Sequence, residues 1–355
     1  MNIAVLVGGY SNERNVSFSS GAMVTRALRE NGHNVAIIDA FLGIKDKITI
    51  EQLYREEIPS DWYSMASVPV DLKKIIRENE SNSLIGPNVF DICKEVDVVF
   101  LALHGGYGED GRIQACLDCL GIKYTGSDYL SSGIAMNKDI TKVIASEFGI
   151  KTPAWKVEHL VSLEQVDKLV TSNSSYPLVV KVPDSGSSVG VYITKNRDEL
   201  RSALVKNLGR KIVLEQYIKG REIQMAFLDK EALPSIEIVP VSEYYTYENK
   251  YKKGGAIEQS PANIEPRLEK MMADMLMDVV QAIGVSDYSR ADFIIDENSE
   301  IWFIEINTLP GMTVTSLLPQ EAASKGINFN KLCELMIEMA VQKNVGLKKE
   351  SESIN

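Results

Sequence analysis

Three side chains near the end of the chain, those of Asp292, Glu305 and Asn307, have the chemistry of a divalent-metal site. Asp292 lies in one predicted strand, and Glu305 and Asn307 end the next one. Because side-chain direction repeats every second residue, Arg290 shares a strand face with Asp292, and Glu305 shares one with Asn307. If the two strands are neighbours, the three oxygen donors meet. Such hard donors suit octahedral Mg²⁺ that bridges the phosphates of a nucleotide.

The alternative is that these carboxylates form a polar row facing solvent. The neighbouring runs 293–295 and 301–304 are apolar, however, and this indicates two buried strands. Unpaired carboxylates would be costly in buried strands. We therefore favour the metal site.

Three glycine-rich segments, 8–13, 104–111 and 186–190, follow predicted strands. At the carboxyl end of a strand, glycine lets backbone N–H groups approach an anionic ligand, and a following helix adds positive potential. A tight turn is the usual alternative for any single segment. None has the pattern of a nicotinamide-binding or Walker loop, so those two classes lose their signature.

Apolar strands and amphipathic helices alternate in the first part of the chain, which is typical of an α/β layer with a parallel sheet. A second unit is expected to start near residues 124–127. No function is assigned to residues 44–96, and residues 242–262 are interpreted as a polar loop. We predict strands at 3–7, 34–39, 97–103, 177–182, 211–218, 222–228, 233–240, 287–295 and 300–307, and helices at about 17–30, 138–148, 197–207, 264–283 and 328–343.

The composition limits the classes of protein. A chain of 355 residues is long enough for about two or three domains. It has 38 Lys+Arg against 49 Asp+Glu, a net charge of −11, which argues against binding to nucleic acid or to an anionic membrane surface. The start carries no basic leader, and no apolar run approaches the roughly 20 residues that cross a bilayer, so we expect a soluble cytoplasmic protein.

The four cysteines are too few and too scattered for a disulfide framework. Cys116 and Cys119 form a C-x-x-C, but no second pair completes a zinc site. Because segment 113–120 has helical apolar spacing, we interpret both cysteines as core residues.

The segment from Glu305 to Thr313, Glu305-Ile306-Asn307-Thr308-Leu309-Pro310-Gly311-Met312-Thr313, is accompanied upstream by His104-Gly105, Glu109-Asp110-Gly111, Met136-Asn137-Lys138 and Gly186-Ser187-Ser188-Val189-Gly190. Together these motifs resemble the D-alanine:D-alanine ligase family of the ATP-grasp superfamily. The matches run in order from Gly8 to about Ala340 and leave out residues 44–96 and the tail.

The resemblance implies an α/β ATP-grasp fold. An N-terminal Rossmann-like domain with a parallel sheet would precede two α+β subdomains that clamp ATP. The implied boundaries are 1–126 for the N-terminal domain, 127–222 for the central subdomain, 223–345 for the C-terminal subdomain and 346–355 for a polar tail.

The resemblance also implies which residues bind ATP and its metal ions. Lys138 and Lys181 would neutralise phosphates, and Lys250 would reach the terminal one. Two Mg²⁺ ions, which Mn²⁺ could replace, would bind at the metal site described above. Adenine and ribose would be held by one short segment, through Glu215, Tyr217, Ile218 and Glu222. Judged without the family, a lone lysine or glutamate is more often a surface charge, but Lys181 lies in an apolar strand and needs an anionic partner.

The implied reaction proceeds through an acyl phosphate. The γ-phosphate of ATP would be transferred to the carboxylate of one D-alanine, and the amine of a second D-alanine would attack the product. Arg290 could donate to the phosphoryl group and to the oxyanion, and the backbone N–H of Gly311 would be the second oxyanion donor. A structural ion pair with the metal carboxylates is the alternative for Arg290.

Four residues would hold the two amino acids. The resemblance places Glu13 at the ammonium of the first D-alanine and His104 near its carboxylate. Ser316 and the backbone of Leu317 would hold the carboxylate of the second. Without the family, Glu13 could be an ordinary acid of a first helical turn, and His104 a locally hydrogen-bonded residue.

Glu13, Ser187 and Tyr251 match a hydrogen-bonded set that, in the family, closes a mobile loop over the site. The pair Lys250-Tyr251 ends this loop here. A closed loop would keep water away from the acyl phosphate. An exposed loop aromatic is the alternative for Tyr251.

The motifs predict ligation of two D-alanine molecules for peptidoglycan precursor synthesis. The retained Lys250-Tyr251 pair favours D-alanine as the second substrate over D-serine or D-lactate, which remain alternatives, as does a nucleotide-binding ATP-grasp module without activity. The sequence departs from the family pattern at Asn137, Val182 and Ala291, where the family commonly has aspartate, proline and a larger aliphatic residue. A homodimer through the N-terminal domain is expected from the family.

Overall fold

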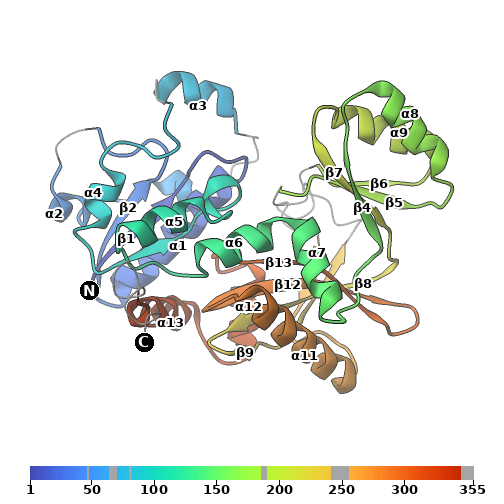
Figure 1. The fold of residues 1–355 in the computed structure, drawn as a ribbon. Coiled ribbons are helices and arrows are strands. Elements are labelled where there is room, and N and C mark those ends of the chain that lie inside the picture. The colour runs from blue at the N-terminus through green and yellow to red at the C-terminus, as the bar shows by residue number, and fades with distance from the viewer. Residues whose placement is uncertain (46–47, 64–69, 80–81, 185–189, 241–255, 345–355) are drawn as a thin grey trace, which may run out of the picture.

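The structure is a computed structural model that describes residues 1–45, 48–63, 70–79, 82–184, 190–240 and 256–344. Its strands form three sheets (Figure 1). In Figure 1 the N-terminal sheet lies at the left, a four-stranded sheet at the upper right, and the largest sheet below. Among the residues described, no helix has the length and apolar character needed to span a membrane.

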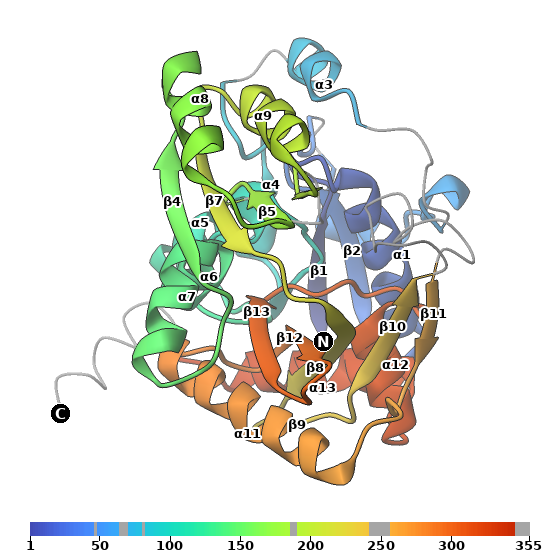
Figure 2. The same cartoon turned by 90° about the vertical axis from the view of Figure 1, so that its right-hand side faces the viewer.

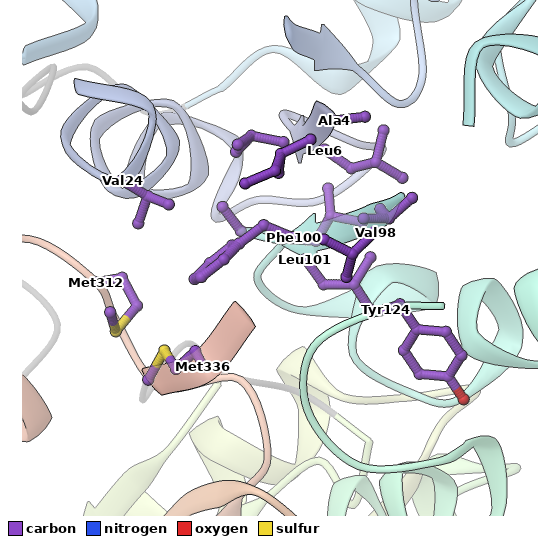
Figure 3. Packing of buried hydrophobic residues seen from close by; sticks show 14 of the residues in the cluster. Ala4, Leu6, Val24, Val98, Phe100, Leu101, Tyr124, Met312 and Met336 are labelled. Atoms are coloured by element: carbon purple, nitrogen blue, oxygen red, sulfur yellow. The ribbon is translucent and has the colours of Figure 1, made fainter. Parts of the chain in front are cut away.

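The N-terminal body is built on a parallel sheet in the order β2–β1–β3, from β1 (Asn2–Val7), β2 (Asn34–Asp39) and β3 (Val98–Leu101). Apart from Asn2, Asn34 and Asp39 at strand ends, its strand residues are apolar and buried, as expected for a sheet that is covered on both faces. Helices α1 (Arg14–Glu30) and α13 (Phe329–Gln342) pack against each other and against this sheet. Figure 3 shows their shared core, with Val24 of α1 and Met336 of α13 beside Phe100 of β3. Helix α13 therefore completes the core of the N-terminal body.

The other helices that the structure describes in the N-terminal body are short, and four of them lie within residues 44–96, to which no function was assigned. They are α2 (Ile50–Leu53), η1 (Ser60–Tyr63), α3 (Leu72–Asn79), α4 (Val89–Cys93), η2 (Gly106–Gly108) and α5 (Arg112–Cys119).

The largest sheet has the order β11–β10–β8–β12–β13, and β9 pairs with β8. Helices α6, α7 and α11 contribute to one hydrophobic core with this sheet, and α12 packs beside β8 and β10 (Figure 2). Phe293 and Phe303 meet edge to face in this core, with ring centroids 5.9 Å apart. The elements are β8 (Gly220–Leu228), β9 (Glu231–Ala232), β10 (Ile236–Pro240), β11 (Ala256–Gln259), β12 (Tyr288–Asp296), β13 (Ile301–Asn307), α6 (Tyr129–Met136), α7 (Lys138–Glu147), α11 (Pro266–Ile283) and α12 (Leu317–Ser324).

The four-stranded sheet is antiparallel, in the order β4–β7–β5–β6. Its core is shared with two helices, α8 and α9, and contains Val180, Leu200 and Leu214. The elements are β4 (Trp155–His159), α8 (Leu163–Ser172), β5 (Leu178–Lys181), β6 (Tyr192–Thr194), α9 (Arg197–Lys206) and β7 (Lys211–Gln216).

The predicted order of elements is confirmed over most of the chain, including the parallel N-terminal sheet. Four of the described strands were not predicted: β4, β6, β9 and β11, the last of which lies within the segment interpreted as a polar loop. Helices α6 and α7 precede the four-stranded sheet in sequence but pack on the largest sheet. Strand β8 crosses the proposed boundary at residue 222, and the division into three domains stays a prediction.

The interpretation of Cys116 and Cys119 as core residues was wrong. Both are exposed on α5, whose buried face carries Ile113 and Leu117 instead. The apolar spacing was real, but the cysteines flank the buried stripe. The two buried thiols are those of Cys93 and Cys333.

We expect two of the four thiols to react quickly with an aromatic disulfide reagent in the native protein. Burial raises the pKa of Cys93 to about 12 and that of Cys333 still further, so neither forms the reactive thiolate. The number of fast-reacting groups in a spectrophotometric titration checks this. A Cys116→Ala/Cys119→Ala double variant should lose the fast phase, and a fast phase retained by that variant would contradict the assignment.

Candidate active site

The predicted metal-binding residues meet on the paired strands β12 and β13. Their antiparallel register places Asp292 opposite Glu305 and Arg290 opposite Asn307. A break in register follows directly, between Asp292 and Phe293, and the regular pairing resumes beyond it. Two carboxylates and one amide oxygen therefore lie together on one face, as the alternation of side chains predicted.

The guanidinium of Arg290 forms two hydrogen bonds with one of these carboxylates, that of Asp292. Its Nε donates to Oδ1 of Asp292 at 2.9 Å, and a second guanidinium nitrogen donates to Oδ2 at 3.2 Å. Both side chains are mostly buried. Burial disfavours the charged guanidinium, but the attraction of Asp292 and its hydrogen bonds outweigh this and raise the pKa of Arg290. The guanidinium is thus permanently charged beside the predicted metal-binding residues.

Lys138 provides a second cation at the face of the largest sheet on which Glu305 lies. It is the first residue of α7, and its Nζ lies 3.3 Å from Oε2 of Glu305. Asn137 caps the same helix, because its side-chain oxygen accepts from the backbone N–H groups of Asp139 and Ile140. Asparagine and aspartate are equally good N-caps, so this departure from the family pattern keeps the helix start in place.

The four-stranded sheet adds Lys181 and Glu215. In the pairing of β5 with β7, Val179 lies opposite Glu215. Lys181, two residues after Val179, therefore points to the same face of the sheet as Glu215. Lys181 Nζ lies 2.7 Å from Glu215 Oε1. Burial opposes the charge of Lys181, but Glu215 and then Glu305 raise its pKa. Figure 2 shows β5 and β7 above β13, which is consistent with this coupling between the two sheets.

Lys142, which the sequence analysis missed, is the second cation on Glu215. Its side chain is fully buried, and its Nζ lies 2.8 Å from Glu215 Oε2 and donates to Thr152 Oγ1 at 2.6 Å. Burial lowers the pKa of Lys142 to about 8, although Glu215 raises it. The two lysines in turn outweigh burial and lower the pKa of Glu215. A signal was available in the sequence, since Lys142 lies one helical turn after Lys138 on α7.

The remaining predicted nucleotide contacts lie at the connection between the two sheets. Strand β7 ends at Gln216 and β8 begins at Gly220, so Tyr217 and Ile218 lie in the link. Ile218 is buried, Tyr217 is half-buried, and Glu222 follows on β8. These residues are therefore in one place, as predicted, next to Glu215.

Glu13 lies against the glycine-rich loop that follows β3. Its side chain is buried although it precedes helix α1 directly. A Cβ on Gly105 would lie 2.5 Å from Oε2 of Glu13, and Gly105 has φ 65°. Only glycine fits at this position, both for the backbone and for the neighbouring carboxylate.

His104, Gly311, Ser316 and Leu317 lie around one loop after β13. The His104 ring nitrogens lie 3.0 Å from Ser20 Oγ and 3.0 Å from the carbonyl oxygen of Leu309. A Cβ on Gly311 would lie 2.9 Å from Ser316 Oγ, so these two residues touch. Ser316 precedes α12, and Leu317 begins it.

Ser187, Lys250 and Tyr251 fall outside the residues that the structure describes. Their predicted roles in closing a loop therefore stay predictions. Within the described parts of the chain, no group of three or more His, Cys, Asp or Glu side chains is arranged to hold a metal ion. The predicted metal site has only two such side chains, those of Asp292 and Glu305. Its third donor is the amide oxygen of Asn307, which accepts from the N–H of Leu309 at 3.0 Å.

Glu109 is a buried carboxyl that the motifs included without a role. The N–H of Gly105 donates to its Oε2 at 2.8 Å. Burial raises the pKa of Glu109 to about 7, against the opposing effects of that hydrogen bond, Lys138 and Arg290. Glu109 and Glu13 thus flank Gly105.

Cations and carboxylates facing each other between two antiparallel sheets, beside a parallel N-terminal sheet, define the ATP-grasp class of fold. The family description "D-ala D-ala ligase N-terminus" matches residues 2–127, and "D-ala D-ala ligase C-terminus" matches residues 144–338. The chain belongs to the D-alanine–D-alanine ligase family, and the resemblance seen in the motifs is confirmed.

Named relatives agree over nearly the whole chain. A D-alanine–D-alanine ligase of Pediococcus pentosaceus is 39% identical over 344 residues, which cover 95% of this chain and 97% of that protein. A D-alanine–D-alanine ligase of Aquifex aeolicus is 34% identical over 339 residues, which cover 95% of this chain and 100% of that protein. The crystal structure of a Bacillus anthracis D-alanine–D-alanine ligase complexed with ATP has a TM-score of 0.72 and 30% identity, with 99% of both chains covered.

We expect Lys142 and Glu215 to be strongly coupled in stability. Lys142→Met leaves a buried carboxylate with one cation fewer, which should lower the free energy of unfolding by about 3 kcal/mol. Combined with Glu215→Gln, the loss should fall short of the sum of the single losses by about 1 to 3 kcal/mol. Urea denaturation of the four proteins measures this cycle.

The exposed pair Lys151 and Glu300, 2.5 Å apart, is the matched control. Its coupling should stay below about 1 kcal/mol, because water screens it. Additive losses at Lys142 and Glu215 would contradict a shared buried ion pair.

Glu109 should make stability fall as the pH rises. Its pKa of about 7 exceeds the ordinary value of 4.5, so the folded state holds this proton more tightly than the unfolded chain does. The resulting stabilisation is complete below pH 4.5 and is lost as the pH rises through about 7. A Glu109→Gln variant cannot ionise and should be more stable than wild type at pH 8, by on the order of 1 to 3 kcal/mol.

The advantage of Glu109→Gln should shrink toward acid pH, which urea denaturation at several pH values measures. Glu147→Gln, at an exposed residue of α7, controls for the loss of a carboxyl group as such. An advantage independent of pH would show that Glu109 ionises normally.

Proposed function

We propose that this chain joins two D-alanine molecules into D-alanyl-D-alanine, a peptidoglycan precursor, and converts ATP to ADP and phosphate in doing so. One observation carries the proposal: Asp292 and Glu305 lie directly opposite each other on paired strands, and each also holds a cation, Arg290 or Lys138. A carboxylate pair with neutralising cations suits a metal-bound polyphosphate. The family of the chain supports the identity of the amino acids.

Asp292, Glu305 and Asn307 are proposed to hold two Mg²⁺ ions, which Mn²⁺ could replace. The donor set fits, since Mg²⁺ prefers carboxylate and carbonyl oxygens. When bound, such ions neutralise charge on the transferred phosphoryl group. Lys138 and Lys181 are proposed to contact phosphates, and Glu215, Tyr217, Ile218 and Glu222 are proposed to hold adenine and ribose. Lys250 would reach the terminal phosphate.

The chain's own residues would then carry out two steps. An oxygen of the first D-alanine carboxylate attacks the γ-phosphorus, the bond to ADP breaks, and an acyl phosphate forms. The amine of the second D-alanine attacks the acyl carbon, phosphate leaves, and the amine gives up a proton. Arg290 is proposed to donate to the phosphoryl group in the first step and, with the N–H of Gly311, to the oxyanion in the second.

The substrate contacts are proposed from the family and supported by position. Glu13 would pair with the ammonium of the first D-alanine, and Ser316 and Leu317 with the carboxylate of the second. Ser316 touches Gly311, so the second substrate would lie beside the proposed oxyanion donor. Ser187 and Tyr251 would join Glu13 in closing the site. A cytoplasmic location, a homodimer and the three-domain division are further proposals that rest on the family.

The test is a substrate panel with mass detection of the product and a phosphate-release assay. With ATP and Mg²⁺, D-alanine alone should give the dipeptide and phosphate in equal amounts. Chelation should abolish turnover, and Mg²⁺ should restore it. Product formed only when D-serine or D-lactate is added would reassign the second substrate, and no turnover with any of them would leave a nucleotide-binding module.

Arg290→Ala should lower kcat at least about a hundredfold, as expected for loss of a donor to developing charge. Arg201→Ala removes an arginine from the exposed pair with Asp167 on the four-stranded body and should change kcat less than about twofold. Full activity of Arg290→Ala would show that Arg290 forms only a structural ion pair with Asp292.

A further inference from the structure

A series of hydrogen bonds through His104 joins helix α1 to the loop after β13. Ser20 comes from α1, His104 follows β3, and Leu309 and Met312 flank Gly311 in the loop. All four partners are almost completely buried, with exposed fractions of 0% for Ser20, 6% for His104, and 2% for both Leu309 and Met312. Figure 3 shows Met312 beside Met336, within the core that α1 and α13 share with the N-terminal sheet.

The geometry fixes the direction of every bond. His104 Nδ1 lies 3.0 Å from the carbonyl oxygen of Leu309. A carbonyl can only accept, so Nδ1 carries the proton. In the neutral ring Nε2 must then accept, and the hydroxyl of Ser20, 3.0 Å away, donates to it. Ser20 Oγ in turn accepts from the N–H of Met312 at 3.2 Å.

These bonds hold both sides of the glycine. The carbonyl of Leu309 is fixed by the ring of His104, and the N–H of Met312 is fixed by the hydroxyl of Ser20. Only Pro310 and Gly311 lie between the two anchored residues. The direction of the Gly311 N–H is therefore set by groups that belong to the N-terminal body.

We propose that Ser20 is a positioning residue for catalysis: its hydroxyl holds the N–H of Met312 and the ring of His104, whose Nδ1–H holds the carbonyl of Leu309, and these bonds together orient the N–H of Gly311 toward the oxyanion. This inference rests on the proposed function, in which Gly311 donates to the tetrahedral intermediate. It gives His104 an indirect role, through the loop, because both of its ring nitrogens already have protein partners.

Ser20→Ala removes one oxygen atom and disturbs both ends of the loop. The buried N–H of Met312 loses its acceptor, and Nε2 of His104 loses its donor. The Leu309 carbonyl still favours the Nδ1–H tautomer, but the ring is then held at one nitrogen only and can turn away from that carbonyl. The Leu309 carbonyl would lose its donor in that case.

The spectroscopic test uses ¹⁵N-labelled histidine and long-range ¹⁵N–¹H correlation spectra. The chain has 3 histidines, so the signals can be assigned with one His104→Gln variant. At a pH of about 8.5, where an ordinary imidazole is neutral, wild-type His104 should show the Nδ1–H pattern. Ser20→Ala should shift the Nε2 resonance of His104, which loses its hydrogen-bond donor, and should speed hydrogen exchange at the Met312 amide.

The matched control is Ser19→Ala, one residue away on the same helix. Ser19 is 1% exposed, and its hydroxyl has no hydrogen-bond partner among the described residues. The same atom is removed from the same buried helix, but the tautomer of His104, the exchange at Met312 and the activity should stay as in wild type.

In the ligase assay Ser20→Ala should lower kcat about 10- to 100-fold, while KM for ATP changes less than about twofold. A wild-type Nε2–H pattern, which needs no variant to observe, would overturn the proposal. So would a Ser20→Ala protein with faster exchange at Met312 but unchanged kcat. A wild-type protein without ligase turnover would refute the proposed function instead, and the Nε2 resonance and the exchange at Met312 would still decide whether Ser20 holds the ring and the loop.

Discussion

Compensation of buried charge is the constraint on which the rest of the structure depends. Glu215 is 3% exposed and could not remain ionised there without Lys181 and Lys142, which hold one oxygen each. The same condition applies to Arg290 with Asp292 on the largest sheet. Because Lys142 comes from α7, which packs on the largest sheet, Glu215 gains its second cation only when α7 and the four-stranded sheet are assembled together. The buried charges thus help to specify the arrangement of the two sheets.

Strand pairing converts this requirement into geometry. The register of β12 and β13 brings Asp292 against Glu305, and the irregularity after Asp292 separates this polar end of the pair from the apolar end that packs in the core. On the other sheet, Glu215 is the next-to-last residue of β7, so the charge lies where the chain crosses from one sheet to the other. Rigid strands therefore carry the charged groups, and a three-residue link, 217–219, joins the bodies that hold them.

The sequence predicted the parts of the site that follow from local periodicity. Alternation along two apolar strands was enough to bring Asp292, Glu305 and Asn307 together, and hydrophobic runs located most strands and helices. Lys142 could not be recognised in this way, because its partner Glu215 lies on a strand that is distant in sequence and its burial depends on the packing of three elements. The prediction that Cys116 is a core residue was wrong for the opposite reason. Helical spacing shows that a helix has a buried stripe, but residues at the border of this stripe can face either the core or the solvent. The place of α13 against the N-terminal sheet is likewise a property of the whole fold.

The N-terminal body contributes to the site by fixing backbone groups rather than by supplying charge alone. The carboxyl groups of Glu13 and Glu109 both lie against Gly105, and a side chain at position 105 would displace Glu13. Ser20 and His104 reach across to the loop that holds Gly311. Helix α13 is anchored to the same body, where it closes the core next to Met312. A loop supported only by the largest sheet would have no such constraint on its backbone, so the N-terminal body and the loop after β13 must be assembled before the backbone N–H groups of this loop take up fixed directions.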